Sequence, residues 1–190
     1  MTRARVGVLI SGSGSNMHAL VKASRAADYP AEITCVVSNT PEAGGLQIAK
    51  SEGIATHVVN HKNYPTRDAF DAALNAYLQS QNLDLIACAG FMRIMTPLLI
   101  GPWQGRMINI HPSLLPLYKG LHTHERAIAD GQKFGGCSVH YVTLELDGGP
   151  VIAQTQVPIL AGDSADKLAA RVLIEEHKLY PAALAEVARV

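Results

Sequence analysis

The sequence predicts an α/β fold with a doubly wound, mostly parallel sheet and helices on both of its faces. Two observations lead to this prediction. Short runs of apolar and β-branched residues recur over the first 111 residues, and longer amphipathic stretches separate them. Each run is apolar at successive positions, as in strands that are covered on both faces. Strands that alternate with helices form βαβ units with right-handed crossovers.

Five strands and three helices are expected in this first part of the chain. The strands are expected at residues 5–10, 33–38, 56–59, 83–88 and 107–111. The helices are expected at about 16–26, 43–52 and 67–81. In the third helix, Phe70, Leu74 and Leu78 recur at helical spacing and predict one buried face.

The alternation of strands and helices stops after residue 111. Pro112, Pro116 and Gly120 indicate a long loop. A short helix then follows, from His124 to Asp130, and a glycine comes directly after it. The C-terminal part of the chain is therefore expected to add other elements to the parallel sheet.

Two more strands and one more helix complete the prediction. Residues 136–143 and 151–159 read as strands on either side of the turn 147–150, and they are expected to add antiparallel pairing. Residues 163–166 offer an N-cap for a last helix that runs to about residue 178. No repeat or linker divides the chain, so we expect a single domain over residues 1–190.

Composition and charge exclude several classes of protein. With 48% hydrophobic and 17% charged residues, the chain is typical of a globular protein and unlike a coiled coil or a disordered chain. Its 16 basic and 16 acidic residues argue against a nucleic-acid partner. The first apolar run is too short for a signal peptide or a membrane span. Three cysteines without a CxxC pair favour a reducing, cytoplasmic compartment.

The loop between the first strand and the first helix has the chemistry of an anion site. Residues 11–16 read Ser-Gly-Ser-Gly-Ser-Asn. Glycines let the backbone approach a ligand, and a helix N-terminus offers free N–H groups and a partial positive charge. The GxGxxG pattern fails at Met17, and the loop has no P-loop lysine. A monophosphate site is the preferred interpretation, and a simple capped turn is the alternative.

The segment around Asn109 and His111 is the most informative part of the sequence. On a strand these two side chains point to the same side, at the carboxyl end where α/β sheets bind ligands. An amide can stabilise a developing oxyanion, and an imidazole can exchange a proton near neutral pH. The alternative is an amide that caps the loop and a histidine buried in the core.

Other polar residues carry weaker signals. Asp147 is a carboxylate in a turn, and it could orient or charge a histidine across a cleft. His122 and His124 lack the further ligands of a metal site, so no metal is expected. Cys137 and His140 have opposite strand parity and are expected to diverge, which argues against a thiol nucleophile.

Taken together, these motifs closely resemble the folate-dependent formyltransferases, and the resemblance covers nearly the whole chain. The matching segments are residues 10–16, 89–95, 109–116, 120–124, 138–140, 146–151 and 176–181. The Asn-x-His-Pro-Ser-Leu-Leu-Pro and Asp-Gly-Gly segments are shared across the family and indicate the reaction. The Ser-Gly-x-Gly-Ser-Asn loop is more particular to the members that act on glycinamide ribonucleotide, and it indicates the acceptor.

The resemblance implies a Rossmann-like formyltransferase fold and a specific reaction. The formyl group of 10-formyltetrahydrofolate, the co-substrate, would pass to the amine of 5′-phosphoribosylglycinamide in purine biosynthesis. No metal would be needed, and the partners would be these small molecules rather than nucleic acid or membrane. A monomer and a homodimer both remain open. The half up to about residue 105 would hold the nucleotide phosphate, and residues 106–190 would hold the folate and catalytic groups.

The resemblance also assigns roles to individual residues. Asn109, His111 and Asp147 would be catalytic, with a protonated His111 stabilising the oxyanion and Asp147 favouring the imidazolium. The residues expected to contact the phosphate and ribose are Gly14, Ser15, Asn16 and Glu176. Those expected to contact the folate are Arg67, Met92, Arg93, Ile94, Met95 and Asn109.

Three alternative functions are distinguishable. An initiator-tRNA formyltransferase would require a second domain and a basic surface, which this neutral chain does not offer. A formyltetrahydrofolate hydrolase would use water as the acceptor. A non-catalytic relative would bind folate or nucleotide without turnover, since a fold alone does not prove an activity.

Overall fold

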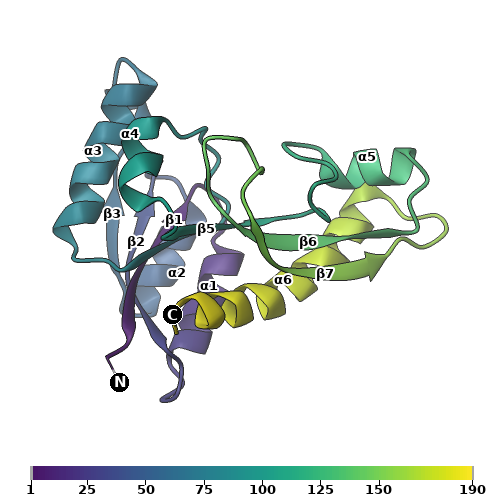
Figure 1. Cartoon of the computed structure of the whole chain (residues 1–190), viewed down its shortest axis with the longest axis horizontal. Helices are drawn as coiled ribbons and strands as arrows, with labels where there is room; N and C mark the ends of the chain where they lie inside the picture. Colours follow the sequence, from purple (N-terminus) through teal and green to yellow (C-terminus); the bar gives the residue numbers. More distant parts are fainter. Residues whose placement is uncertain (1, 190) are drawn as a thin grey trace.

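The computed structural model describes residues 2–189, and within them seven strands form one sheet (Figure 1). The strands are β1 (Ala4–Ile10), β2 (Ala31–Ser38), β3 (Ala55–Val58), β4 (Leu85–Cys88), β5 (Met107–His111), β6 (Phe134–Tyr141) and β7 (Val151–Pro158). Their order across the sheet is β3-β2-β1-β4-β5-β6-β7. The first five are parallel, and β6 and β7 continue the sheet antiparallel. The predicted fold class is confirmed.

Helices connect the parallel strands as the sequence predicts. The α-helices are α1 (Ser15–Ser24), α2 (Gly44–Ser51), α3 (Arg67–Ser80), α4 (Pro97–Ile100), α5 (Thr123–Ala129) and α6 (Ala165–Val187). Two 3₁₀ turns, η1 (His61–Asn63) and η2 (Gly101–Trp103), complete the set. The short helix α4 and the two 3₁₀ turns have no counterpart in the sequence prediction, because such brief elements carry no periodic pattern.

The expected end of the last helix, near residue 178, is wrong. Helix α6 continues through Pro181 to Val187, although an interior proline costs about 3 kcal/mol. Tyr180 and Leu184 are fully buried on either side of Pro181. Burying one large apolar side chain stabilises by about 1.5–3 kcal/mol, so the packing of the helix end outweighs the proline.

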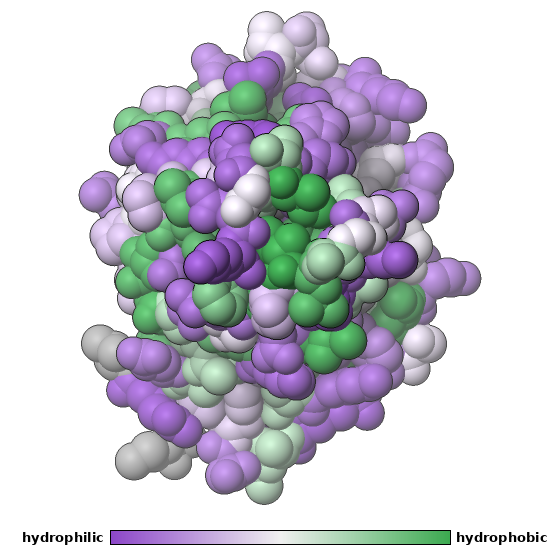
Figure 2. Space-filling model, turned by 90° about the vertical axis from the view of Figure 1, so that its right-hand side faces the viewer, coloured by the Kyte–Doolittle hydropathy of each residue, from purple (hydrophilic) through white to green (hydrophobic). Residues whose placement is uncertain are grey.

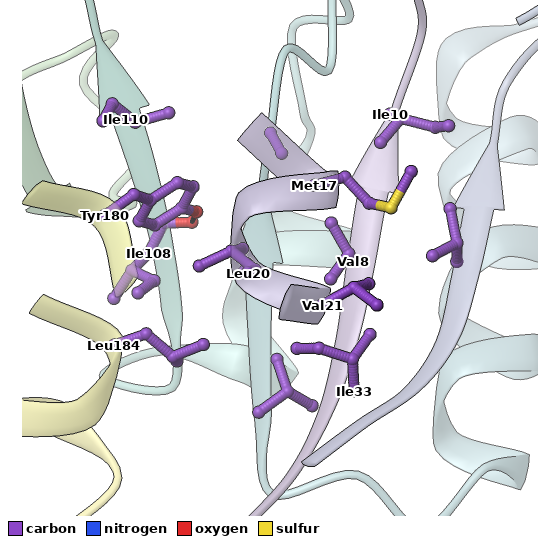
Figure 3. Close-up of a cluster of buried hydrophobic side chains, with 14 of the residues drawn as sticks. Val8, Ile10, Met17, Leu20, Val21, Ile33, Ile108, Ile110, Tyr180 and Leu184 are labelled. Atoms are coloured by element: carbon purple, nitrogen blue, oxygen red, sulfur yellow. Dashed lines mark hydrogen bonds between the residues drawn. The ribbon is translucent and has the colours of Figure 1, made fainter. Parts of the chain in front are cut away.

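The core is divided between the two faces of the sheet. On one face, α1 and α6 cover β1, β2 and β5, and the labelled side chains of Figure 3 interlock there. On the other face, α3 and the α4 segment cover β4, with Phe70, Leu74 and Trp103 buried among strand residues. A third, smaller cluster joins β6 and β7 to the beginning of α6. The predicted coverage of both sheet faces is therefore confirmed for the parallel strands.

The antiparallel strands extend the molecule to one side. Figure 2 looks onto this end and shows apolar side chains gathered among polar ones. Phe134 at the start of β6 and Leu160 after β7 are about half exposed here. The connection between β6 and β7, residues 142–150, returns toward the end of β5 and is called the strap below. It carries Asp147 to the edge of the sheet where the parallel strands end.

Two further properties bear on the sequence predictions. All three cysteines, Cys35, Cys88 and Cys137, are free thiols and buried. Cys137 packs beside Leu168 and Val172, away from His140, which confirms the predicted divergence of their side chains. Among residues 2–189, no helix has both the length and the apolar character that a membrane span needs.

Candidate active site

Strand β5 supplies the first two polar groups of the site. Alternation along the strand places Ile108 and Ile110 in the core beneath α1 and α6, so Asn109 and His111 project from the opposite face. Asn109 lies opposite Cys88 of β4 and opposite His140 of β6. The predicted pairing of an amide and an imidazole at the carboxyl end of a parallel strand is therefore present.

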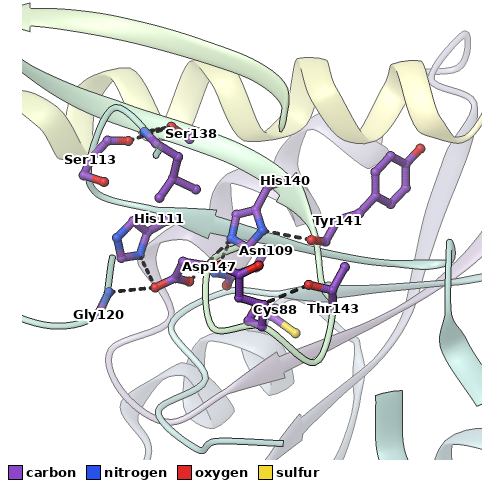
Figure 4. Close-up of polar contacts among 12 residues, drawn as sticks. Cys88, Asn109, His111, Ser113, Gly120, Ser138, His140, Tyr141, Thr143 and Asp147 are labelled. Atoms are coloured by element: carbon purple, nitrogen blue, oxygen red, sulfur yellow. Dashed lines mark hydrogen bonds and ion pairs between the residues drawn. The ribbon is translucent and has the colours of Figure 1, made fainter. Parts of the chain in front are cut away.

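The strap brings Asp147 to these two residues (Figure 4). Its Oδ2 atom lies 3.4 Å from Nδ1 of His111 and accepts the Gly120 N–H at 2.9 Å. Asp147 itself adopts a left-handed backbone conformation, with φ near 49°. Close packing of the strap requires Gly149, because a Cβ atom there would lie 1.8 Å from the Tyr141 carbonyl oxygen. The turn is thus built to hold the carboxylate against His111.

His140 is the fourth member of this cluster, and the sequence analysis did not assign it a role. Its Nε2 atom lies 3.2 Å from Nδ2 of Asn109 and 3.6 Å from Oδ1 of Asp147. Its Nδ1 atom lies 2.9 Å from the Tyr141 carbonyl, which can only accept a hydrogen bond. Nε2 is then free to accept the Asn109 amide N–H. A signal was available: His140 is a polar residue on a strand expected to join the same sheet.

The electrostatics of Asp147 favour its ionised form. Burial acts to raise the pKa of the carboxyl. The adjacent His140 side chain, the Gly120 N–H and the His111 imidazole act in the other direction and prevail. The pKa of Asp147 therefore lies below its usual range, and the group is a carboxylate at neutral pH.

Burial favours the neutral form of His111 in the free protein. Burial lowers the pKa of His111, while the Tyr118 carbonyl and Asp147 act to raise it without compensating fully. Nε2 lies 2.8 Å from the Tyr118 carbonyl oxygen and donates to it. The ring is only 6% exposed, so the cost of charging it is high. Negative charge next to the ring acts in the opposite direction and favours the imidazolium.

A cleft of about 110 Å³ opens beside this cluster. Asn109, His140 and Asp147 line one side, and the loop after β4 lines the other with Arg93, Ile94 and Met95 among its residues. Four of the residues expected to contact folate, Arg93, Ile94, Met95 and Asn109, therefore come together. His111 is absent from the lining and lies behind Asp147.

Two of the residues expected to contact folate do not line this cleft. Met92 belongs to the same loop, but its side chain is 66% exposed. Arg67 lies in the first turn of α3 and is exposed there. Both lie outside the cleft as the structure describes it. Their contact with the folate remains a sequence prediction.

The predicted anion loop has the geometry of an open helix N-terminus. Gly14 is the N-cap of α1 with φ near 77°, and no side chain caps the first turn. The first N–H groups of α1 therefore have no partner within the helix. Gly14 also packs directly against α2, since a Cβ on it would lie 2.5 Å from Cα of Gly45.

Glu176 reaches this loop from α6. Asn16 donates through Nδ2 to Oε2 of Glu176 at 2.6 Å. Burial raises the pKa of Glu176, and the Asn16 hydrogen bond opposes this only in part. Oδ1 of Asn16 is buried without a hydrogen-bond partner, and such an atom is costly unless a ligand or water satisfies it. The structure thus brings Glu176 to Asn16, which follows Gly14 and Ser15 in the same turn. The sequence prediction grouped these four residues, although Asn16 and Glu176 are 160 positions apart.

The chain is similar to known proteins over most of its length. The formyl transferase family model matches residues 4–184. Phosphoribosylglycinamide formyltransferase of Escherichia coli (strain K12) is 47% identical over 174 residues, which cover 92% of this chain and 82% of that protein. The crystal structure of phosphoribosylglycinamide formyltransferase from Brucella melitensis is 51% identical, with a TM-score of 0.95 over 98% of this chain and 96% of that chain.

Longer relatives contain the same unit. The trifunctional purine biosynthetic protein adenosine-3 of Homo sapiens is 45% identical over 186 residues. The match covers 98% of this chain and 18% of the human protein, so the chain spans about a fifth of such relatives. The matching family model, the sequence identities and the shared architecture lead to one conclusion: this chain belongs to the formyl transferase family.

Proposed function

We propose that this chain transfers the formyl group of 10-formyltetrahydrofolate to the amine of 5′-phosphoribosylglycinamide. The products are formylglycinamide ribonucleotide and tetrahydrofolate. The observation that carries the proposal is the convergence of Asp147 on His111 and Asn109 beside a cleft. Relatives named phosphoribosylglycinamide formyltransferase share most of the chain, which supports the choice of acceptor.

The nucleotide is assigned to the open N-terminus of α1. The backbone N–H groups of Ser15 and Asn16 would receive the 5′-phosphate, since a helix N-terminus favours an anion. Glu176 is positioned to accept hydrogen bonds from ribose hydroxyls. The unpartnered Oδ1 of Asn16 supports this assignment, because a bound hydroxyl or amine would satisfy it.

The folate co-substrate is assigned to the cleft between the strap and the loop after β4. Phe91, Ile94 and Met95 supply apolar walls for a planar ring, and Arg93 and Asp147 supply polar contacts. Arg67 and Met92 are assigned to its outer portion. The co-substrate supplies the formyl group. Binding both substrates side by side at this sheet edge accounts for a large part of the acceleration, because it removes the entropic cost of their encounter.

Residues of this chain would stabilise the negative charge that develops on the formyl oxygen and would transfer one proton of the amine. As the amine adds to the formyl carbon, negative charge develops on the formyl oxygen. One Asn109 N–H is directed at His140, and the other is free to stabilise that oxygen. The Asp147 carboxylate would accept the proton of the amine and pass it to Nδ1 of His111, which then carries the positive charge beside the carboxylate. The proton leaves with the folate nitrogen as the bond from that nitrogen to the formyl carbon breaks.

We propose further that residues 1–190 act as one domain. The phosphate anchor would belong to the half that ends near residue 105, and the catalytic groups to the half that follows. Two contacts cross this boundary. Glu176 of the second half meets Asn16, and residues 93–95 of the first half line the cleft opposite Asn109. Each substrate would therefore touch both halves.

Formyl transfer followed by the absorbance change of a 10-formylfolate donor tests the proposal. The expected result is a signal that requires glycinamide ribonucleotide. Loss of formyl from the donor without the nucleotide would show a hydrolase instead. Binding of both ligands without any turnover would show a binding protein and would overturn the proposed reaction.

A further inference from the structure

Ser11 links the two loops to which the nucleotide and the folate are assigned. It follows β1 directly, and two residues separate it from the Gly14–Asn16 turn. Its backbone N–H donates to the Gly90 carbonyl at 3.1 Å. Its hydroxyl oxygen accepts the Met92 N–H at 2.8 Å. One residue on the nucleotide side is therefore bonded twice to the loop that lines the folate cleft.

The orientation of the Ser11 hydroxyl is fixed by a third partner. The hydroxyl donates to Oδ1 of Asn39 at 2.5 Å, and Asn39 is only 5% exposed at the end of β2. A hydroxyl has one hydrogen, so once this is given to Asn39 a lone pair must face Met92. The three contacts tie together the ends of β1 and β2 and the loop that follows β4.

The loop assigned to the nucleotide is held in place by close contact with the start of α2. The Gly45 N–H donates to the Gly12 carbonyl at 3.0 Å, and Gly14 packs against Gly45 with no room for a side chain. A displacement of the Gly14–Asn16 turn is therefore passed to Ser11 and from there to Met92. The next three residues, 93–95, line the cleft. These contacts form a short path from the Gly14–Asn16 turn to the loop that lines the cleft.

We infer that Ser11 is a positioning residue that couples the two substrate sites, so that nucleotide bound at the α1 N-terminus strengthens folate binding in the cleft. The inference rests on the proposed function. Coupling between two bound ligands is reciprocal, so folate must strengthen nucleotide binding by the same factor. Removing the hydroxyl leaves the Met92 N–H and the Asn39 oxygen without their partner, and this weakens the path without touching either ligand.

Binding measured by calorimetry tests the coupling without turnover. Glycinamide ribonucleotide and tetrahydrofolate form a pair that has no formyl group to transfer. The dissociation constant of each is measured alone and in the presence of saturating amounts of the other. For the unaltered chain we expect a mutual strengthening of about fivefold or more. For Ser11→Ala we expect a factor close to one, with nucleotide binding alone changed less than twofold.

Two further variants separate coupling from a general loss of structure. Ser11→Thr keeps the hydroxyl and is expected to keep the coupling. Ser13→Ala removes an exposed serine of the same loop, whose side chain makes no hydrogen bond in the described structure, and is also expected to keep it. Equal coupling in Ser11→Ala and the unaltered chain would overturn the inference, as would binding of both ligands to the unaltered chain without coupling. If neither ligand bound the unaltered chain, the proposed function itself would fall.

Discussion

Asp147 lies between the rings of His111 and His140, and its charge opposes the effect of burial on the pKa of His111. Burial pushes the pKa of His111 down, and the carboxylate is one of two groups that push it up. The neutral ring and the ionised carboxyl together define the resting state of the site. In the proposed mechanism, Asp147 would therefore act as the base and the imidazole would become charged during the reaction.

The titration of His111 can be followed by NMR of its ring nitrogens in the free protein. We expect its pKa to lie below the ordinary value near 6.5, so the ring stays neutral as the pH falls through that value. Asp147→Asn removes a charge that favours the imidazolium and should lower the pKa further. Glu145→Gln removes an exposed carboxylate of the same strap, which pairs with Lys119, and should leave the pKa unchanged. A rise of the pKa in Asp147→Asn would contradict this account.

Asn109 is the donor that we assign to the formyl oxygen. Asn109→Ala should lower kcat on the order of 10²-fold, the usual effect of losing one oxyanion donor, with little change in KM. Asn16→Ala serves as the matched control, because it should raise KM for the nucleotide and leave kcat nearly unchanged. Steady-state kinetics of formyl transfer measure both. An effect of Asn109→Ala on KM alone would show that Asn109 only binds substrate.

Single residues also show how far the sequence could predict the site. Asn109 and His111 were predictable because strand alternation fixes their common side. Asp147 could be proposed only as a partner across a cleft, since the strap that delivers it has no periodic pattern. His140 received no role because its contact with Asn109 depends on which strands become neighbours, and the sequence does not state the pairing of β5 with β6.

At the level of elements, the junction of β1 and α1 depends on a single glycine. Gly14→Ala should lower the free energy of unfolding by about 1–3 kcal/mol, because φ is near 77° and the new Cβ would meet the Gly45 backbone. It should also weaken nucleotide binding by displacing the first turn of α1. Gly12→Ala is the control, since a Cβ at Gly12 has no neighbour within 4 Å. Urea unfolding and calorimetry measure the two effects, and equal behaviour of the two variants would disprove the argument.

Most helices and strands were predictable from the local sequence pattern, and the exceptions have a physical cause. The parallel strands were predictable from their apolar runs, because strands covered on both faces contain few polar residues. Helix α6 was expected to end early, but tertiary packing of Tyr180 and Leu184 carries it past Pro181. A local pattern cannot predict a stabilisation that depends on contact with α1 and β5.

The whole molecule is organised around a core that joins its two halves. The cluster on the α1 face includes residues of β1 and β2 together with β5 and the end of α6. Neither half can therefore bury its own apolar surface alone. The proposed nucleotide site also combines the two halves, since Asn16 of the first half donates a hydrogen bond to Glu176 of the second.

This shared core predicts one cooperative unfolding transition. Trp103 is the only tryptophan and is 3% exposed in the cluster beneath α3, so its fluorescence reports on the first half of the chain. Far-ultraviolet circular dichroism reports on all helices and strands. The two signals should change at the same urea concentration. Separate transitions would show that the halves are independent domains.

Because all three thiols are buried, their reaction with alkylating reagents can report transient opening of the fold. Burial raises the pKa of Cys88 and of Cys137 to about 12, and Glu176 and Glu175 add to the effect at Cys137. The thiolate is the reactive form, so alkylating reagents cannot modify these groups while the fold is closed. Cys88 sits beneath α3, and Cys137 lies at the far end of the sheet. The rates at which the two are alkylated therefore report, site by site, how often each end of the sheet exposes its interior to solvent.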